Sequence, residues 1–327
     1  MVNRAMAPLW TPTALPCAPD GAGLPMQQHP AYGMACATLG SAPAWFEWRE
    51  GSEVLATAQV LSRRWPLFGR FALLSRGPAF APGLPAETRR AAIAALLTAL
   101  ARDHRGVLAT PDRIAGADPL AGGRFLRMVS GAHVARLSLE PDADRLRAGL
   151  HQKWRNRLKR AEAGGLALDE GDFPDAPDHW LLREEAVQAH ARRYARLPPA
   201  FALAWARLGE TLLVTATRDG RPQAGMLFLI HRPWASYHLG WTSAEGRREN
   251  AHTLMLWRAI VALKARGITA LELGVLDTVG TPDLARFKLG TGAAPVQLGA
   301  TWMDAPGSRL VAALTRGLIP AGASRSR

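Results

Sequence analysis

Two stretches of the chain share one succession of hydrophobic and polar patterns. Each has three short runs of β-type pattern divided by tight turns, then a long helical pattern, then one more apolar run. A β-β-β-α-β unit is therefore predicted twice, as a repeat of architecture rather than of sequence. The first copy has predicted strands at 45–50, 54–64 and 70–77, a helix at 87–105 and a strand at 107–110. The second has strands at 211–220, 222–232 and 237–243, a helix at 250–267 and a strand at 268–276.

Residues at the helix ends indicate where the two long helices begin and stop. We expect Gly106 to cap the first helix and Gly267 the second, because glycine adopts the left-handed conformation without strain. Asn250 is the expected N-cap of the second helix, since its side chain can accept a hydrogen bond from a free backbone N–H.

The fold class that follows is α+β, with two tandem domains that each contain a mixed, mostly antiparallel sheet flanked by helices. A helical stretch joins the two units, and we place the boundary near residue 149, in a charged segment. Leu310–Leu318 could form a short amphipathic helix. The predicted domains are a flexible N-terminal arm at 1–24, a first domain at 25–148, a second at 149–305 and a basic tail at 306–327.

Composition adds a strong positive charge to this picture. The 327 residues carry a formal net charge of +13, with a pI near 11.0, so attraction to polyanions is expected. A general bias towards arginine is the alternative explanation. The proline-broken start does not resemble a signal peptide, and the apolar run from Ala91 is too short to span a bilayer. These features, with only two cysteines (Cys17 and Cys36), predict a cytoplasmic protein without an integral membrane segment.

The chain lacks the usual patterns for covalent or metal catalysis. There is no Gly-x-Ser-x-Gly elbow, no convincing Cys-His pair and no histidine spacing for a metal, so we expect no metal site. Acyl transfer to an amine needs none of these. It needs a deprotonated amine, a positioned donor and stabilisation of an oxyanion.

Several segments, in their order, resemble the Fem-type acyltransferases of the GNAT superfamily, which have two tandem GNAT folds. The segments are PMQQHPAYG from Pro25, SRGPAF from Ser75, KWRNRLKRAEAGG from Lys153, LMLWRAIVALKARGITALELGVLD from Leu254, RFKLGTGA from Arg286 and LGATW from Leu298. The resemblance implies an N-acyltransferase without a tightly bound cofactor. Its co-substrate would be aminoacyl-tRNA or acyl-CoA. Its acceptor would be the amine of an anionic small molecule or lipid-linked molecule, such as a peptidoglycan precursor.

Two departures from the family pattern leave the donor open. No sustained heptad run follows Gly165, so the chain resembles the type without a coiled-coil arm. CoA-using GNAT proteins bind pyrophosphate through an Arg/Gln-x-x-Gly-x-Gly/Ala loop, whereas Asn250 and His252 occupy the glycine positions counted from Arg247. The second departure disfavours acyl-CoA, while the missing arm favours it.

The resemblance implies catalytic roles for Lys288, Asp277 and Tyr237. Lys288 corresponds to a basic residue that contacts the donor and the developing negative charge; a solvated loop lysine is the alternative. Asp277 ends a predicted strand and could take the proton of the amine, although an Asx turn explains it equally well. Tyr237 lies on the strand that diverges from its neighbour in GNAT folds, or is simply a core aromatic.

Further residues are assigned to the donor and the acceptor. Arg247 and Arg248 precede a helix N-terminus and could bind a phosphate there. The predicted donor-binding residues are Gly240, Trp241, Arg247, Arg248, Asn250, Phe287 and Gly290. The predicted acceptor-binding residues are Gln28, Tyr32, Arg64, Arg76, Lys153 and Arg157.

The segment from Lys153 to Arg160 carries five cations and no acid. Trp154, Leu158 and Ala161 recur at helical spacing, which predicts a helix with one buried stripe. Its cations could bind phosphates, or glutamates such as Glu162 could neutralise them internally. The helix is too short and too polar for a membrane anchor.

Two other kinds of function remain open beside acyl transfer. A non-catalytic protein that binds RNA or a nucleotide on a GNAT-like scaffold needs only the basic surface, yet no RNP strand or GxxG loop is present. A degenerate scaffold kept for protein interaction is the third.

Overall fold

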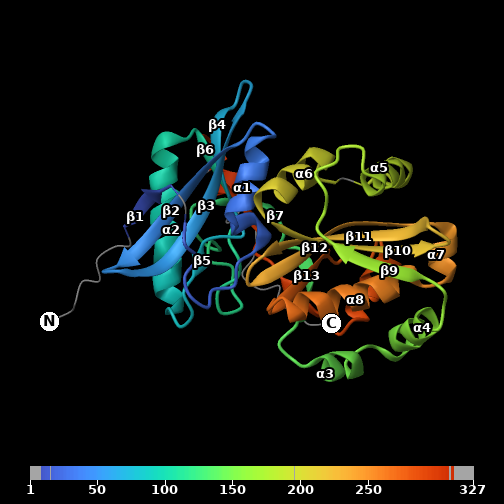
Figure 1. The fold of residues 1–327 in the computed structure, drawn as a ribbon. Helices are drawn as coiled ribbons and strands as arrows, with labels where there is room; N and C mark the ends of the chain where they lie inside the picture. Colours follow the sequence, from blue (N-terminus) through green and yellow to red (C-terminus); the bar gives the residue numbers. More distant parts are fainter. Residues whose placement is uncertain (1–8, 15, 195, 309–310, 313–327) are drawn as a thin grey trace. The chain divides into compact units, whose positions relative to one another are not determined.

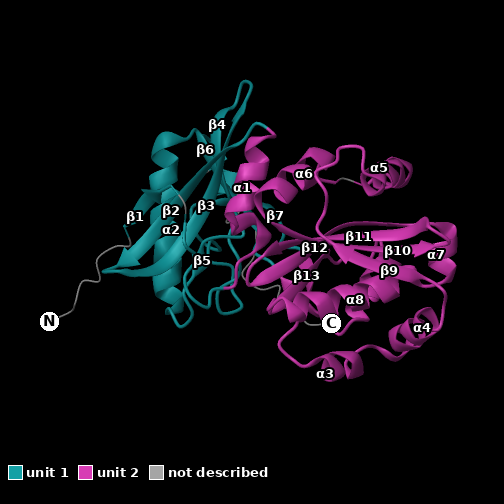
Figure 2. Ribbon diagram, viewed as in Figure 1, with its two compact units in different colours: residues 1–22, 40–132, 298–327 teal, residues 23–39, 133–297 magenta. Residues whose placement is uncertain are grey.

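The computed structural model describes residues 9–14, 16–194, 196–308 and 311–312. The chain forms two compact units, which Figure 2 colours separately. The first unit comprises residues 1–22, 40–132 and 298–327, and the second comprises 23–39 and 133–297. The compact units therefore differ from the predicted continuous domains at 25–39, 133–148 and 298–305. The predicted domain boundaries, as limits of independently folding parts, stay a prediction.

The first unit is a mixed sheet with the order β1-β2-β3-β4-β6-β15-β7, to which β5 adds at β3. Among the described residues of this unit, only β4 and β6 pair in parallel, and α2 is the crossover between them. Alternate residues of the central strands, among them Val60 and Leu74, belong to one core cluster with Ile93 and Leu97 of α2. Helix α2 runs along this sheet (Figure 1). The elements are β1 (Trp10–Thr13), β2 (Ala42–Glu50), β3 (Glu53–Trp65), β4 (Gly69–Ser75), β5 (Ala79–Phe80), α2 (Ala86–Asp103), β6 (Gly106–Thr110), β7 (Leu126–Val129) and β15 (Thr301–Asp304).

The second unit repeats this plan with the order β14-β8-β13-β12-β11-β10-β9, and in its described part only β12 and β13 are parallel. Its sheet elements are β8 (His133–Ser138), β9 (Ala167–Gly171), β10 (Glu210–Arg218), β11 (Arg221–His231), β12 (Trp234–Thr242), β13 (Ala270–Val275) and β14 (Ala294–Gln297). Its helices are a 3-10 turn (Met26–Gln28), α1 (Pro30–Ala37), α3 (Ala143–Ala148), α4 (Gln152–Glu162), α5 (Trp180–Arg192), α6 (Pro199–Leu208), α7 (Ala244–Arg248), α8 (Ala251–Ala265) and α9 (Pro282–Leu289).

Helices cover both faces of the second sheet. Met226 and Phe228 of β11 belong to the core cluster that includes α8, whereas a Cβ on Gly225 would meet Trp180 and Leu181 of α5. A strand covered on both faces is apolar along its whole length rather than alternating. This explains why β11 reads as a continuous apolar run from Ala224 to Ile230.

The predicted fold class is confirmed: each unit is a mixed sheet flanked by helices, and the β-β-β-α-β succession occurs twice. The buried stripe of the basic helix is confirmed as well. Trp154, Leu158 and Ala161 of α4 are all buried, and Trp154 and Leu158 belong to the core of the second unit.

Some local predictions were wrong. Residues 10–13 lie within the predicted flexible arm, yet they form β1, which pairs with β2. Gly106 begins β6 instead of capping α2, and a Cβ there would lie 2.3 Å from the Phe71 ring. Asn250 does hold the N-cap position of α8, but its φ is 57° and its side chain makes no capping hydrogen bond.

Gly267 has the predicted left-handed conformation, with φ of 78° after α8. Most of the predicted helix Leu310–Leu318 and of the basic tail lies outside the described residues. No helix in the described part of the chain is both long enough and apolar enough to cross a membrane.

Candidate functional site

The parallel strands β12 and β13 part from each other halfway along their length. They pair only from Trp234 with Ala270 to Ser236 with Glu272, although β12 continues to Thr242 and β13 to Val275. The corresponding strands of the first unit, β4 and β6, stay paired to their last residues, Ser75 and Thr110. The second unit therefore has an opened sheet edge that the first unit lacks, and backbone groups of β12 after Ser236 have no partner in β13.

Tyr237 and Gly240 lie on the separated part of β12. A Cβ on Gly240 would lie 2.4 Å from the Tyr237 hydroxyl oxygen and 3.2 Å from the Gly225 carbonyl oxygen, so a larger residue there would require Tyr237 to shift. Burial raises the pKa of Tyr237, and the nearby Tyr194 and Glu185 raise it further. The hydroxyl consequently stays protonated at physiological pH.

Helix α5 covers this part of β12 with polar side chains that the sequence did not point to. Gln188 Nε2 donates to the Gly240 carbonyl at 3.3 Å and to the Tyr194 hydroxyl at 3.2 Å. Tyr194 in turn donates to the buried Glu185, at 3.0 Å. The sequence predicted a helix here, but its pattern gives no signal of which strand the helix covers.

Lys288 lies in α9 and is only 7% exposed. Its Nζ donates to the Val275 carbonyl at 2.8 Å, at the end of β13 and beyond the last residue that pairs with β12. Burial lowers the pKa of Lys288 to about 8. The amine is therefore not a solvated loop lysine. It is a buried group at the end of the sheet where the parallel strands have parted.

Two of the predicted neighbours of Lys288 hold its helix in place. The Phe287 ring packs on Trp154 of α4, with 6.0 Å between ring centroids. A Cβ on Gly290 would lie 2.7 Å from Trp154 Cδ1, and the Gly290 carbonyl accepts a hydrogen bond from His151 N at 2.9 Å. Both residues therefore contact α4, and their predicted contact with a donor stays a prediction.

The two carboxylates near the end of β13 differ in their surroundings. Asp277 is exposed, and its Oδ1 accepts hydrogen bonds from Val279 N at 3.1 Å and Gly280 N at 2.7 Å, which is an Asx turn. Glu272 is buried and forms an ion pair of 2.7 Å with Arg136. Asp277 is thus the carboxylate of the two that solvent and a substrate can reach.

The chain after β12 places the predicted phosphate-binding residues on a short helix. Ser243 caps α7, and Arg247 donates to the Thr242 carbonyl at 3.3 Å. Arg248 pairs with Glu245 at 3.3 Å, both exposed.

Trp241 precedes this helix and contacts α5 and α8. Its ring packs edge-on against Trp180 of α5, with 5.8 Å between centroids. Its carbonyl accepts a hydrogen bond from His252 Nε2 at 3.0 Å. Burial is the main reason that the pKa of His252 is lowered.

The predicted acceptor residues are distributed over both units. Gln28 is buried next to α1, and Tyr32 of α1 packs edge-on against Phe201 at 5.5 Å between centroids. Lys153 and Arg157 are exposed on α4, and neither has an ion pair in the described part of the chain.

The other two predicted acceptor residues belong to the first unit. Arg64 is exposed at the end of β3. Arg76 is buried, and its guanidinium contacts both carboxylate oxygens of Asp112 at 3.2 Å. Arg76 therefore has an internal partner, whereas Arg64 offers its charge to solvent.

Glutamates that could neutralise the α4 cations have other partners. Glu162 receives two hydrogen bonds from Arg147, of 2.8 and 2.6 Å, from the preceding helix. The buried Glu185 pairs with Arg196 at 2.7 Å. Internal neutralisation of Lys153 and Arg157 by these glutamates is not seen.

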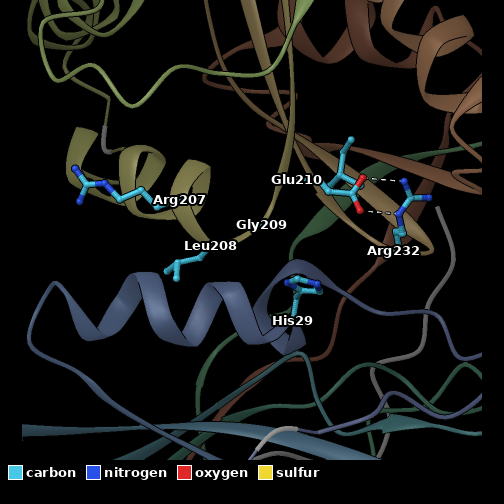
Figure 3. A pocket seen from close by; sticks show the side chains of 7 residues that line it. His29, Arg207, Leu208, Gly209, Glu210 and Arg232 are labelled. Atoms are coloured by element: carbon cyan, nitrogen blue, oxygen red, sulfur yellow. Dashed lines mark hydrogen bonds and ion pairs between the residues drawn. The ribbon is translucent and has the colours of Figure 1, made fainter.

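A cavity of about 450 Å³ at the other end of the second sheet is polar but internally neutralised (Figure 3). Arg232 binds both carboxylate oxygens of Glu210 at 2.7 Å, and this hydrogen bonding lowers the pKa of Glu210. Burial lowers the pKa of His29 to about 4, although Glu210 opposes that shift. Strand register places this cavity near the start of β12, away from the opened edge.

Comparisons with known proteins agree on the fold. The family model for the acetyltransferase (GNAT) domain matches residues 145–289, which include the opened edge and Lys288. The crystal structure of FemX matches with a TM-score of 0.73 at 13% identity, covering 86% of this chain and 92% of that one.

Two further structures are similar over most of the chain. One is the C-terminal domain of a putative lysylphosphatidylglycerol synthetase from Agrobacterium fabrum, with a TM-score of 0.51, 12% identity and coverage of 92% and 96%. The other is a conserved protein of unknown function from Bacteroides thetaiotaomicron, with a TM-score of 0.53, 11% identity and coverage of 84% and 88%. No curated protein matches the sequence. Identities this low establish the fold and not the substrates.

Proposed function

We propose that this chain, whose residues 145–289 match the acetyltransferase (GNAT) domain and whose two-sheet fold is like that of FemX, acylates the amine of an anionic acceptor. The acyl or aminoacyl group would come from acyl-CoA or aminoacyl-tRNA. One observation carries the proposal: the parallel strands of the second unit part after Ser236, and the buried amine of Lys288 lies at that same end.

The opened edge offers a place for the acyl carbonyl. The Gly240 carbonyl accepts from a side chain, Gln188 Nε2, and in a strand the N–H and the carbonyl of one residue point to the same edge. The Gly240 N–H therefore points to the same side of β12 as the Gly240 carbonyl and could donate to an oxyanion there. Removing one such donor typically lowers the rate about 10²- to 10³-fold.

Lys288 would supply the positive charge for the same oxyanion. Attack of the amine on the acyl carbonyl places a negative charge on the carbonyl oxygen, and the carrier then leaves as that charge collapses. A charged group in a buried site stabilises the intermediate more than it would in water. With a pKa of about 8, most Lys288 side chains are protonated at pH 7.

Asp277 is the proposed acceptor of the amine's proton. It is an exposed carboxylate that follows β13, and its Asx turn uses Oδ1 as the hydrogen-bond acceptor. Tyr237 is proposed to act through its protonated hydroxyl beside Gly240, as a donor to the reacting group.

The remaining predicted residues are proposed to hold the two substrates. Arg247, Arg248 and Asn250 would bind a phosphate of the donor, together with Trp241, Phe287 and Gly290. Gln28, Tyr32, Arg64, Arg76, Lys153 and Arg157 would contact the acceptor. The exposure of Lys153 and Arg157 without acidic partners supports an anionic ligand at α4.

A Lys288→Ala variant tests the central residue. Turnover is expected to fall about 10²-fold or more while the far-UV circular dichroism stays unchanged. Undiminished turnover would remove Lys288 from the mechanism. Thermal-shift titration with acetyl-CoA, with aminoacyl-tRNA and with uncharged tRNA separates the donors, since a ligand that binds only the folded state raises the melting temperature. Stabilisation by none of them would exclude both donor classes.

Binding of RNA without catalysis is the second candidate, and the unpaired cations of α4 favour it. Its binding constant would fall steeply with salt concentration. If the protein binds RNA tightly, loses that binding in a Lys153→Gln/Arg157→Gln variant and acylates no amine with either donor, this second function holds.

A further inference from the structure

A cavity in the first unit is lined by residues of β3 and β4 and of the chain that enters β2. Its volume is about 370 Å³. Six residues line it: Gly40, Ser41, Ala42, Ser62, Arg64 and Arg70. It belongs to a different unit from the opened edge of β12 and β13, so it is a separate site.

The strands explain why these side chains share one face. Ala58 and Val60 of β3 point to α2 in the core of the first unit, and side chains alternate along a strand. Ser62 and Arg64 therefore continue that same face beyond the helix, which ends at Asp103. Arg70 of β4 is directly opposite Arg64 in the strand register. The face of the sheet that carries core residues beneath α2 therefore carries two arginines beyond the end of that helix.

A chain of hydrogen bonds orients Arg70. His104 Nδ1 donates to the Leu100 carbonyl at 2.9 Å, which leaves Nε2 of the neutral tautomer as an acceptor. Ser62 Oγ lies 2.7 Å from His104 Nε2 and donates to it. Arg70 donates to Ser62 Oγ at 3.4 Å. This series of hydrogen bonds ends on a backbone carbonyl and contains no carboxylate. It therefore orients the Arg70 guanidinium without neutralising its charge.

The charge of the two arginines is left uncompensated. Like charges directly opposite each other in a sheet are destabilising. Neither Arg64 nor Arg70 has an ion pair anywhere in the described ranges, and no carboxylate lines the cavity. The C-terminus of α2 offers about half a negative charge, and His104 already bonds one of its free carbonyls. About half a charge does not balance two full positive charges.

We infer that this cavity is a binding site for a phosphate or diphosphate group, held by Arg64 and Arg70 with Ser62 and His104 as positioning residues. A guanidinium pair presents planar N–H donors that match phosphate oxygens. The use of the site rests on the proposed function, since the phosphate would belong to the anionic acceptor. Binding itself needs no donor and no transfer.

Calorimetric titration of the full chain with inorganic pyrophosphate tests the site. Arg64→Gln and Arg70→Gln are each expected to weaken binding about tenfold or more, because each removes a charged hydrogen-bond donor. Arg127→Gln is the matched control: Arg127 is exposed on β7, an end strand of the sheet that pairs with neither β3 nor β4, and does not line the cavity. Circular dichroism of each variant verifies that it is folded.

The outcomes divide clearly. The inference is supported if Arg64→Gln and Arg70→Gln both weaken pyrophosphate binding while Arg127→Gln retains it. No binding, equal binding by all variants, or an equal loss in Arg127→Gln overturns it, the last because it would show only diffuse attraction by net charge. Acyl transfer that persists without pyrophosphate binding would reject this site alone, whereas binding without any transfer would reject the proposed function alone.

A second experiment distinguishes a phosphate on a lipid head group from one on a soluble molecule. Flotation with phosphatidylglycerol vesicles is compared with phosphatidylcholine vesicles, using the same variants. Vesicle binding that Arg64→Gln abolishes assigns the phosphate to a lipid head group. Pyrophosphate binding without vesicle binding assigns it to a soluble phosphorylated molecule.

Discussion

The Lys288→Met substitution is expected to stabilise the protein near neutral pH and to abolish acyl transfer. Lys288 is 7% exposed, and its one hydrogen bond in the described structure is to a neutral carbonyl, that of Val275. A charged amine in such surroundings loses hydration that no carboxylate replaces. Methionine has a similar length and no charge, so it can occupy the same space without that cost.

The size of the effect follows from the pKa of Lys288, which burial lowers from 10.5 to about 8. Between these values the unfolded chain binds the proton and the folded chain does not, so the wild-type free energy of unfolding rises with pH. Below pH 8 both states are protonated, and the folded state bears the full penalty. One pKa unit corresponds to about 1.4 kcal/mol. Between pH 7 and pH 10, the free energy of unfolding of the wild type should therefore rise by about 2.5 kcal/mol relative to that of Lys288→Met.

Urea denaturation at pH 7 and at pH 10 measures this difference for both proteins. Other groups titrate over that range, but they do so equally in both, and the difference between the two proteins isolates Lys288. Lys153→Met is the control, because Lys153 is exposed on α4 and its loss should have the same effect at both pH values.

A Lys288→Met variant whose advantage over the wild type is equal at pH 7 and pH 10 would refute the reasoning. The amine would then not be buried as a charge in the folded state. Its proposed role as a cation held ready for the oxyanion would lose its physical basis.

Three more predictions follow from the same site. In Lys288→Arg the alkaline fall in rate, expected near pH 8 in the wild type, should move to higher pH because a guanidinium stays charged; a pH–rate profile measures it. Gly240→Ala should cost about 1–3 kcal/mol through its clash with the Tyr237 hydroxyl, and Tyr237→Phe in the same chain should recover part of that cost in urea denaturation; strict additivity would contradict the clash. Trp154→Ala should cost about 3–5 kcal/mol by thermal unfolding, since the ring supports both the core and Phe287.

The repeated unit and the burial of α4 were predictable because they depend on local periodicity. Strand alternation, tight turns and helical spacing are properties of neighbouring residues, and they located both crossover helices and the stripe of Trp154 and Leu158. The position of a residue within a strand or helix also depends on its neighbours in the sequence. The sequence therefore placed Tyr237 and Gly240 on one strand and Lys288 close to Gly290.

Predictions of which unit or local structure a residue belongs to failed where segments distant in the sequence pair with each other. Residues 10–13 look like a loose arm, yet β2 supplies them with a partner strand. Gly106 looks like a helix cap, yet the constraint on it is the Phe71 ring from another strand. The strand Thr301–Asp304 joins the sheet of the first unit, and His133–Ser138 joins that of the second, so the compact units interleave along the chain.

The order of strands and helices, the excess of positive charge and the residue types available for chemistry follow from the amino-acid sequence. The separation of β12 and β13 after Ser236, the hydrogen bond from Gln188 of α5 to Gly240 and the burial of Lys288 arise only when the chain is folded. Folding also brings Arg64 and Arg70 together without an acid between them. Strand separation, desolvation and uncompensated charge depend on which distant groups surround a residue, and periodicity along the chain carries no record of those neighbours.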